Sequence, residues 1–386
     1  MRIKTKITII TPVHIGTGEE KMNFEYDKKD NVLYCYDPKE LFLCKASKEL
    51  LDKRFLNSLL KSNDGSKRDE LNRMMKKDID YNKLKPIYSL RADFAKIPKG
   101  NISEQLKSLN KPYIPGSSIK GAIMNAIFYD FIKNHLNDFC KYIKNKVETS
   151  KNEPDIDDFL KKYDSRLSDL VKQISNCIIC RDVFYENLVL VEPIRKNVYD
   201  DKKGKLSLSN IECIDVNQTC DDEFIKINTD RKNVIIETLK NDNIKFYDEF
   251  IEYLGIDKII KVCRSYFHDI LDEEIEMEKN NSYYVQEGLD KKLNEFYEDT
   301  VSNGFYMRIG ANTNYFFKTV SYLIKKNDSN LYNKYFYKVF SPKDKPKGKN
   351  KAYPLPDKMP ATRTIYVDDL YAYYPGVIKI EFYKEN

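Results

Sequence analysis

The chain has 386 residues, of which 41% are hydrophobic and 33% charged, a composition typical of a globular protein with room for two domains. No run of about 18 apolar residues occurs and the polar N-terminus does not resemble a secretory signal, so we expect a cytoplasmic protein without a membrane partner. The net charge of +6 is unevenly distributed, with basic stretches at 61–99 and 341–363 and an acidic one at 268–299, which permits a polyanionic partner.

The N-terminal segment predicts a strand followed by a turn that contains glycine. Residues 2–10 alternate and are β-branched, which is typical of a strand with one buried face. In the following turn, residues 11–19, Gly16 and Gly18 permit a close approach of the backbone to a ligand. A β-hairpin is predicted over 24–36 and a helix from Pro38. Residues 55–110 predict a basic insertion that contains one strand.

A second segment, Tyr-Ile-Pro-Gly-Ser-Ser-Ile-Lys-Gly-Ala-Ile over 113–123, predicts the start of a buried helix. The Pro-Gly turn precedes apolar residues that recur on one helical face. Ser117 or Ser118 is suited to cap this helix, and its first turn with Lys120 has the groups that bind a phosphate. The alternative interpretation is that this segment only starts a well-capped helix, with Lys120 exposed to solvent and no phosphate bound.

The remainder of the chain alternates between helical and strand patterns. Helices are predicted over 134–175 and 224–300, and strands near 183–191, 305–310, 364–367 and 376–382. This order favours an α+β protein with antiparallel sheets. We expect two domains, residues 1–200 and residues 201–386.

Two of these segments together resemble the RAMP proteins of type III CRISPR effector complexes. They are Pro-Val-His-Ile-Gly-Thr-Gly-Glu at 12–19 and the helix start at 113–123. The family's C-terminal glycine-rich loop corresponds to 308–319, where Gly310 is present but Asn312 and Asn314 replace glycines. Because asparagine tolerates positive φ, we expect the turn to persist. Within the family, the chain is most similar to the type III-A (Csm complex) subunit that caps the backbone at the crRNA 3′ end.

This resemblance implies two ferredoxin-like (RRM-like) domains, the second of them degenerate, with helical and loop insertions and no cofactor. It also implies crRNA binding, packing against the repeated backbone subunit and support of crRNA 3′-end maturation through recruited nucleases, with target RNA contacted indirectly. Carried onto this sequence, the expected RNA-binding residues are His14, Gly16, Gly18, Ser117, Ser118, Lys120, Arg308, Lys318, Thr319 and Arg363.

Catalysis is the alternative that the family leaves open. Related endoribonucleases cut crRNA precursors without a metal, and here His14 could act as general acid or base with Lys120 stabilising charge. RAMP subunits that do not cleave share this histidine, so we expect it to be structural. Asp27 and Asp30 are expected to be turn residues. The Cys-x-x-Cys at 177–180 has no second ligand pair, so we predict no metal site.

Overall fold

The computed structural model describes residues 3–44, 72–73, 75–76, 79–93, 100–149, 156–197, 206–239, 243–278, 289, 295–296, 301–313, 315–340, 362–368 and 370–385. Asn314, most of the basic stretch 341–363 and much of the predicted insertion lie outside these residues. None of the helices in the described ranges is long and apolar enough to cross a membrane.

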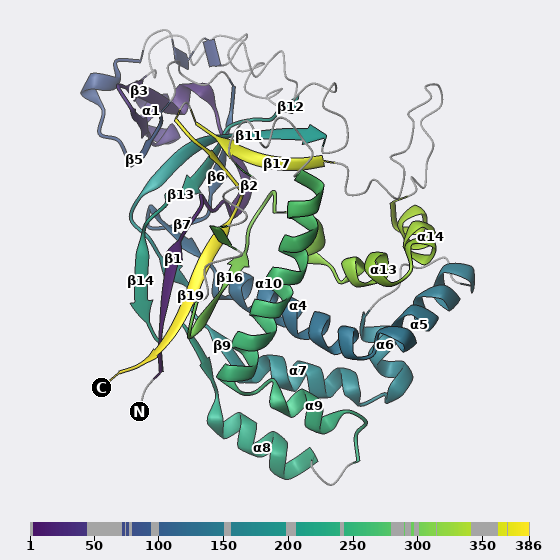
Figure 1. Ribbon diagram of the computed structural model, residues 1–386. Coiled ribbons are helices and arrows are strands. Elements are labelled where there is room, and N and C mark those ends of the chain that lie inside the picture. Colours follow the sequence, from purple (N-terminus) through teal and green to yellow (C-terminus); the bar gives the residue numbers. More distant parts are fainter. Residues whose placement is uncertain are drawn as a thin grey trace.

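One antiparallel sheet joins the two ends of the chain. Its strands lie in the order β14 (Thr219–Asp222), β1 (Ile3–Ile9), β19 (Val377–Lys384) and β16 (Gly304–Arg308). Because β1 and β19 pair over seven residues, Ile3 opposite Lys384 through Ile9 opposite Ile378, the termini lie side by side (Figure 1). The predicted strands at both ends are therefore confirmed.

The second sheet is larger and mixed. Its strand order is β2 (Gly16–Lys21), β6 (Ile102–Gln105), β13 (Ile211–Ile214), β11 (Leu188–Asn197), β5 (Tyr88–Arg91), β4 (Val32–Cys35) and β3 (Tyr26–Lys29). The pairs β11–β5 and β13–β6 are parallel, whereas the sequence favoured purely antiparallel sheets. The long strand β11 also pairs with β12 (Leu206–Ser207) and β17 (Thr362–Val367), and β17 pairs with β18 (Ala372–Tyr373).

Both sheets combine strands from the two halves of the chain. Strand β1 lies between β14 and β19, and β11 lies between β13 and β5. The sheets therefore do not divide at residue 200, although the α+β class is confirmed. Short strands complete the fold: β7 (Lys107–Ser108), β8 (Lys111–Ile114) and β10 (Val183–Phe184) form a small sheet, and β9 (Ile178–Cys180) pairs with β15 (Ile225–Ile227).

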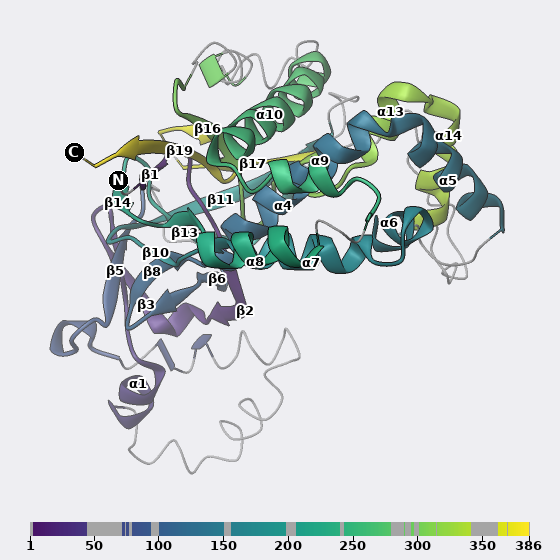
Figure 2. The ribbon, with the colours of Figure 1, turned by 90° about the horizontal axis from the view of Figure 1, so that it is seen from below.

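Two long helices, α4 (Gly116–Asn134) and α10 (Ile256–Glu278), pack against each other, and α10 also contacts β16. The predicted helix near Ser117 is thus confirmed, and its apolar face is fully buried at Ile119, Ile123 and Ala126. Further helices form a lobe on one side of the sheets (Figures 1 and 2). They are α5 (Leu136–Thr149), α6 (Ile156–Tyr163), α7 (Leu167–Cys177), α8 (Thr229–Leu239), α9 (Tyr247–Glu252), α13 (Ser321–Asn327) and α14 (Ser329–Phe340). Helix α1 (Pro38–Cys44) lies apart, beside the β3–β4 hairpin.

Candidate nucleic-acid interface

The glycine-bearing turn at 11–19 is fastened to two other segments. The His14 carbonyl accepts a hydrogen bond from the Ala311 amide at 2.8 Å, and the Ile15 carbonyl accepts one from the Leu106 amide at 2.8 Å. Gly310 has φ +86°, and a Cβ at this position would lie 2.3 Å from the His14 carbonyl oxygen. The turn and the C-terminal loop are therefore in backbone contact, and only glycine fits at their junction.

The degenerate C-terminal loop keeps its turn, as expected from asparagine chemistry. Asn312 adopts φ +62°, and its side-chain amide donates to the Tyr366 hydroxyl at 3.3 Å. The left-handed conformation that glycine would supply is thus supplied by asparagine.

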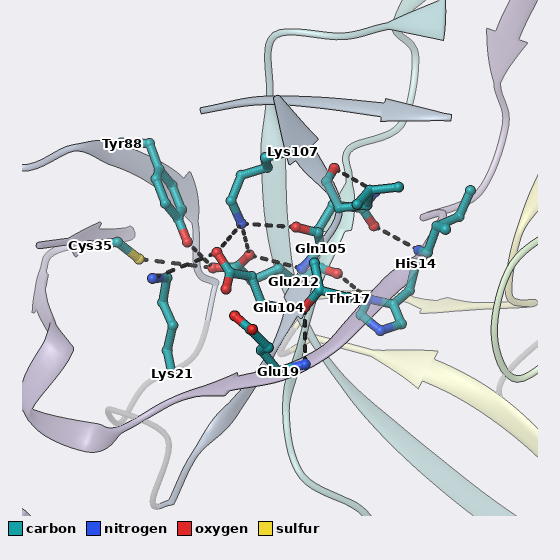
Figure 3. Close-up of polar contacts among 12 residues, drawn as sticks. His14, Thr17, Glu19, Lys21, Cys35, Tyr88, Glu104, Gln105, Lys107 and Glu212 are labelled. Carbon is teal, nitrogen blue, oxygen red and sulfur yellow. Dashed lines mark hydrogen bonds and ion pairs between the residues drawn. The ribbon is translucent and has the colours of Figure 1, made fainter. Parts of the chain in front are cut away.

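The side chain of His14 is buried and anchors the 11–19 turn to the protein interior. This side chain is 5% exposed, and Nδ1 lies 2.6 Å from the Glu212 carbonyl oxygen (Figure 3). Because a carbonyl only accepts, Nδ1 carries the proton. Burial lowers the pKa of His14, which favours the neutral ring. Gly16 leaves room for this ring, since a Cβ there would lie 2.9 Å from Nε2.

A buried charge network lies beside His14 (Figure 3). The fully buried carboxylate of Glu212 accepts from Lys107 Nζ at 2.5 Å, from the Tyr88 hydroxyl at 2.6 Å and from the Gln105 amide at 3.1 Å. The Gln105 side chain accepts from the Ile15 amide at 2.8 Å and donates to the Tyr113 carbonyl at 3.3 Å. Through this glutamine, the network connects the 11–19 turn to the strand that leads into α4.

These network residues were missed by sequence reasoning. One signal was present, because Glu212 interrupts the apolar run Ile-Glu-Cys-Ile at 211–214, where a lone carboxylate requires a buried partner. The identity of that partner depends on strand order: β6 lies beside β13, which brings Lys107 within reach.

The start of α4 differs from the prediction in one respect. Its N-cap is Pro115, and neither serine supplies a side-chain cap. Instead, Asp182 Oδ1 accepts from the Gly116 amide at 2.8 Å, and the Ser118 amide donates to the Pro115 carbonyl at 2.9 Å. One amide at the N-terminus of α4, that of Gly116, therefore already donates a hydrogen bond to a carboxylate of the same chain. This argues against the prediction that the amides of this helix end bind a phosphate.

A surface hollow of about 500 Å³ lies between α4 and residues 308–318. From α4 it is lined by Ser118, Gly121, Ala122, Met124, Asn125 and Phe128. From the other side it is lined by Arg308, Ile309, Gly310, Thr313, Phe317 and Lys318. Ser118 from one family motif therefore meets Arg308, Gly310 and Lys318 from the C-terminal loop, although the two segments are far apart in the sequence. We call this feature the α4 hollow.

Arg308 and Arg363 do not fit the expected role of direct phosphate ligands. Arg308 is 6% exposed and donates twice to the Glu274 carboxylate, at 2.9 and 2.7 Å. Arg363 is 4% exposed, with Nε 3.6 Å from the same carboxylate. Glu274 lies on α10, Arg308 on β16 and Arg363 on β17. The three side chains therefore form a buried Arg–Glu–Arg cluster that ties these elements together behind the α4 hollow.

The other predicted ligands lie at separate places. Lys120 lies near Cys180 of β9: burial raises the pKa of Cys180 to about 12, and the positive charge of Lys120 opposes this rise. Lys120 is not among the residues that line the α4 hollow. Thr319 Oγ1 lies 2.7 Å from Ser321 Oγ at the first turn of α13. Gly16, Gly18 and Ser117 are exposed.

The described residues contain no group of three or more His, Cys, Asp or Glu side chains that could hold a metal ion. Cys177 is buried at the end of α7, and Cys180 is partly buried in β9. The short Cys-x-x-Cys motif thus lies at a helix-to-strand junction.

The fold resembles those of two solved proteins. The first is a chain from the cryo-EM structure of a Csm–crRNA–target RNA ternary complex of a type III-A CRISPR-Cas system, with TM-score 0.65, 18% identity and coverage of 98% of this chain and 100% of that one. The second is the crystal structure of T. onnurineus Csm5, with TM-score 0.52, 19% identity and coverage of 84% and 96%. These structural similarities show that the chain shares the fold of these two proteins.

Residues 6–317 match the RAMP superfamily, and the chain belongs to this family. The sequence is also 26% identical to the CRISPR system Cms protein Csm5 of Methanocaldococcus jannaschii, and the match covers 98% of this chain and 88% of that protein.

Proposed function

We propose that this chain is a crRNA-binding structural subunit of a cytoplasmic type III-A CRISPR effector complex. It caps the repeated backbone subunits at the crRNA 3′ end and supports 3′-end maturation through recruited nucleases. The observation that carries the proposal is the similarity to Csm5, which extends over 98% of this chain. The family membership and the fold likeness to a chain of a Csm–crRNA–target RNA complex support it.

The local chemistry supports RNA contact at the α4 hollow. Lys318 is exposed at its rim, and among the described residues no carboxylate lies within ion-pair distance of this lysine. Partial burial of its ammonium group and the positive charge of the nearby Arg308 lower the pKa of Lys318. A cation without an internal partner beside a hollow is suited to an external anion such as a phosphate.

The endoribonuclease alternative is not favoured by the surroundings of His14. Its Nδ1 proton is engaged by the Glu212 carbonyl, and the ring is 5% exposed. The lysine that acts electrostatically on His14 is Lys107, whereas Lys120 lies near Cys180. His14 and Lys120 therefore do not form the acid–base pair that the alternative requires.

Replacing Lys318 with alanine should weaken binding of the crRNA and reduce the slope of log affinity against log salt concentration by about one, because one phosphate contact is lost. Fluorescence anisotropy over a range of salt concentrations measures both quantities. Lys172→Ala is the control, since Lys172 is exposed on α7 and pairs with Asp169 at 3.4 Å. Equal slopes for Lys318→Ala and the unaltered chain would contradict this contact.

The purified chain should leave repeat-containing crRNA precursor uncut in EDTA, because no acid–base pair is assembled around His14. Denaturing gel electrophoresis of end-labelled RNA checks this expectation. Cleavage at one fixed position that disappears in His14→Ala would establish the endoribonuclease alternative instead.

A further inference from the structure

Gly121 lies within α4 on the wall of the α4 hollow. Glycine inside a helix is less favourable than alanine, because it loses more backbone entropy on folding. Gly121 lines the hollow, and a Cβ added at this residue would meet no other atom of the protein within 4 Å. Internal packing therefore gives no reason for glycine at this position. Its effect is to keep the hollow open beside the helix.

The walls of the hollow are mainly apolar. Ala122, Met124 and Phe128 contribute from α4, and Phe317 contributes from the opposite side. The Phe317 ring is held by the Arg308 guanidinium, whose central carbon lies 5.0 Å from the ring centroid. A volume of about 500 Å³ with apolar walls and few polar groups is typical of a small-ligand pocket. Flat apolar surface next to a cation suits a nucleobase and its phosphate.

Asn125 provides the wall with a hydrogen-bond acceptor. Its amide nitrogen donates to the Tyr266 hydroxyl at 2.5 Å and lies 3.5 Å from the Phe317 carbonyl oxygen. The Tyr266 hydroxyl donates its own proton to the Phe316 carbonyl at 3.1 Å, so it must accept from Asn125. This orientation leaves the Asn125 carbonyl oxygen without a partner among the described residues. An exocyclic amino group of a base would satisfy it.

We propose that the α4 hollow is a base pocket that receives one unpaired nucleobase carrying an exocyclic amino group, while Lys318 contacts the adjacent phosphate. The proposal rests on the proposed function, that this chain binds crRNA. It assigns Gly121 to the approach of the base and Asn125 to the recognition of its amino group. Binding here adds base contact to the backbone contacts expected elsewhere.

The test uses single-stranded RNAs with the sequence of the crRNA 3′ portion, each with one base removed to leave an abasic ribose. At one position, removal of the base should weaken binding to the unaltered chain roughly five- to hundred-fold. Replacing cytidine with uridine there should also weaken binding, because uracil has no amino group. Gly121→Leu fills the hollow, so this variant should bind intact RNA as weakly as the unaltered chain binds the abasic RNA.

Two controls separate this result from misfolding. Gly121→Ala should melt at or above the temperature of the unaltered chain, because its Cβ meets no obstacle and alanine favours the helix. Gln173→Leu places the same bulk on an exposed position of α7 and should bind all the RNAs as the unaltered chain does.

The outcomes also separate the two proposals. Salt-dependent RNA binding with no sensitivity to any abasic position, or with the same sensitivity in Gly121→Leu, would overturn the base pocket and leave the proposed function standing. Equal affinity for cytidine and uridine would overturn the assignment of an amino-bearing base. Absence of RNA binding by both the chain and the assembled complex would overturn both.

Discussion

Replacing Glu274 with alanine should lower the free energy of unfolding by about 3–5 kcal/mol, because removal of one partner leaves charges buried without compensation. The Glu274 carboxylate is fully buried and accepts from Arg308 at 2.9 and 2.7 Å. Arg363 Nε lies 3.6 Å away in the same cluster. Urea denaturation followed by circular dichroism measures the change. RNA binding should weaken as well, since Arg308 and Phe317 line the α4 hollow.

Two comparisons show whether buried charge is the cause. Asp169→Ala breaks an exposed ion pair with Lys172 and should change stability by less than about 1 kcal/mol. The triple variant Glu274→Met, Arg308→Met and Arg363→Met should be more stable than Glu274→Ala, because it retains no buried charge. If the triple variant were the less stable of the two, unpaired buried charge would not be the cause of the destabilisation, and the cluster would instead be a net source of stability.

Replacing Gly310 with alanine should destabilise the protein by more than about 2 kcal/mol, because two penalties combine. Gly310 has φ +86°, which strains any residue with a Cβ, and that Cβ would lie 2.3 Å from the His14 carbonyl oxygen. The backbone contact between the 11–19 turn and the C-terminal loop would have to open. Affinity for crRNA should therefore fall together with the denaturation midpoint.

Gly18→Ala is the matched control for Gly310→Ala. Gly18 has nearly the same φ, +87°, but a Cβ there would meet no atom within 4 Å. Only the backbone strain applies, so we expect a loss of about 1–2 kcal/mol. Equal losses for the two variants would mean that the contact with His14 does not constrain the turn.

The sequence predicted those elements whose patterns are local. Residues 2–10 alternate, and they form β1; the apolar spacing after Ser117 is helical, and it forms α4. The left-handed turn at Asn312 could likewise be predicted, because asparagine tolerates positive φ without help from its surroundings. The family motifs also predicted which distant segments matter, and three of them are brought together around His14, Gly310 and the approach to α4.

Charged side chains were the least predictable part. Arg308, Arg363 and Lys120 all looked like phosphate ligands in the sequence, since nothing local distinguishes an exposed cation from a paired one. The buried position of both arginines beside Glu274 could not be predicted from the sequence, and neither could the position of Lys120 near Cys180 on β9. The same applies to Asp182, which bonds the Gly116 amide that was expected to be free.

The sequence by itself determined the α+β class and the elements with strong local patterns, such as β1 and α4, because these follow from spacing and composition over short stretches. The family resemblance rested instead on the two motifs at 12–19 and 113–123. The tertiary structure alone decided the sheet order, the mixing of both chain halves in each sheet and the partners of the buried charges. The physical reason is that a buried charge is stabilised by whatever lies within a few ångströms of it, and the packing of separate elements decides what lies there. For Glu212 and Lys107 this is the pairing of β6 with β13, and for Glu274 and Arg308 it is the packing of α10 on β16.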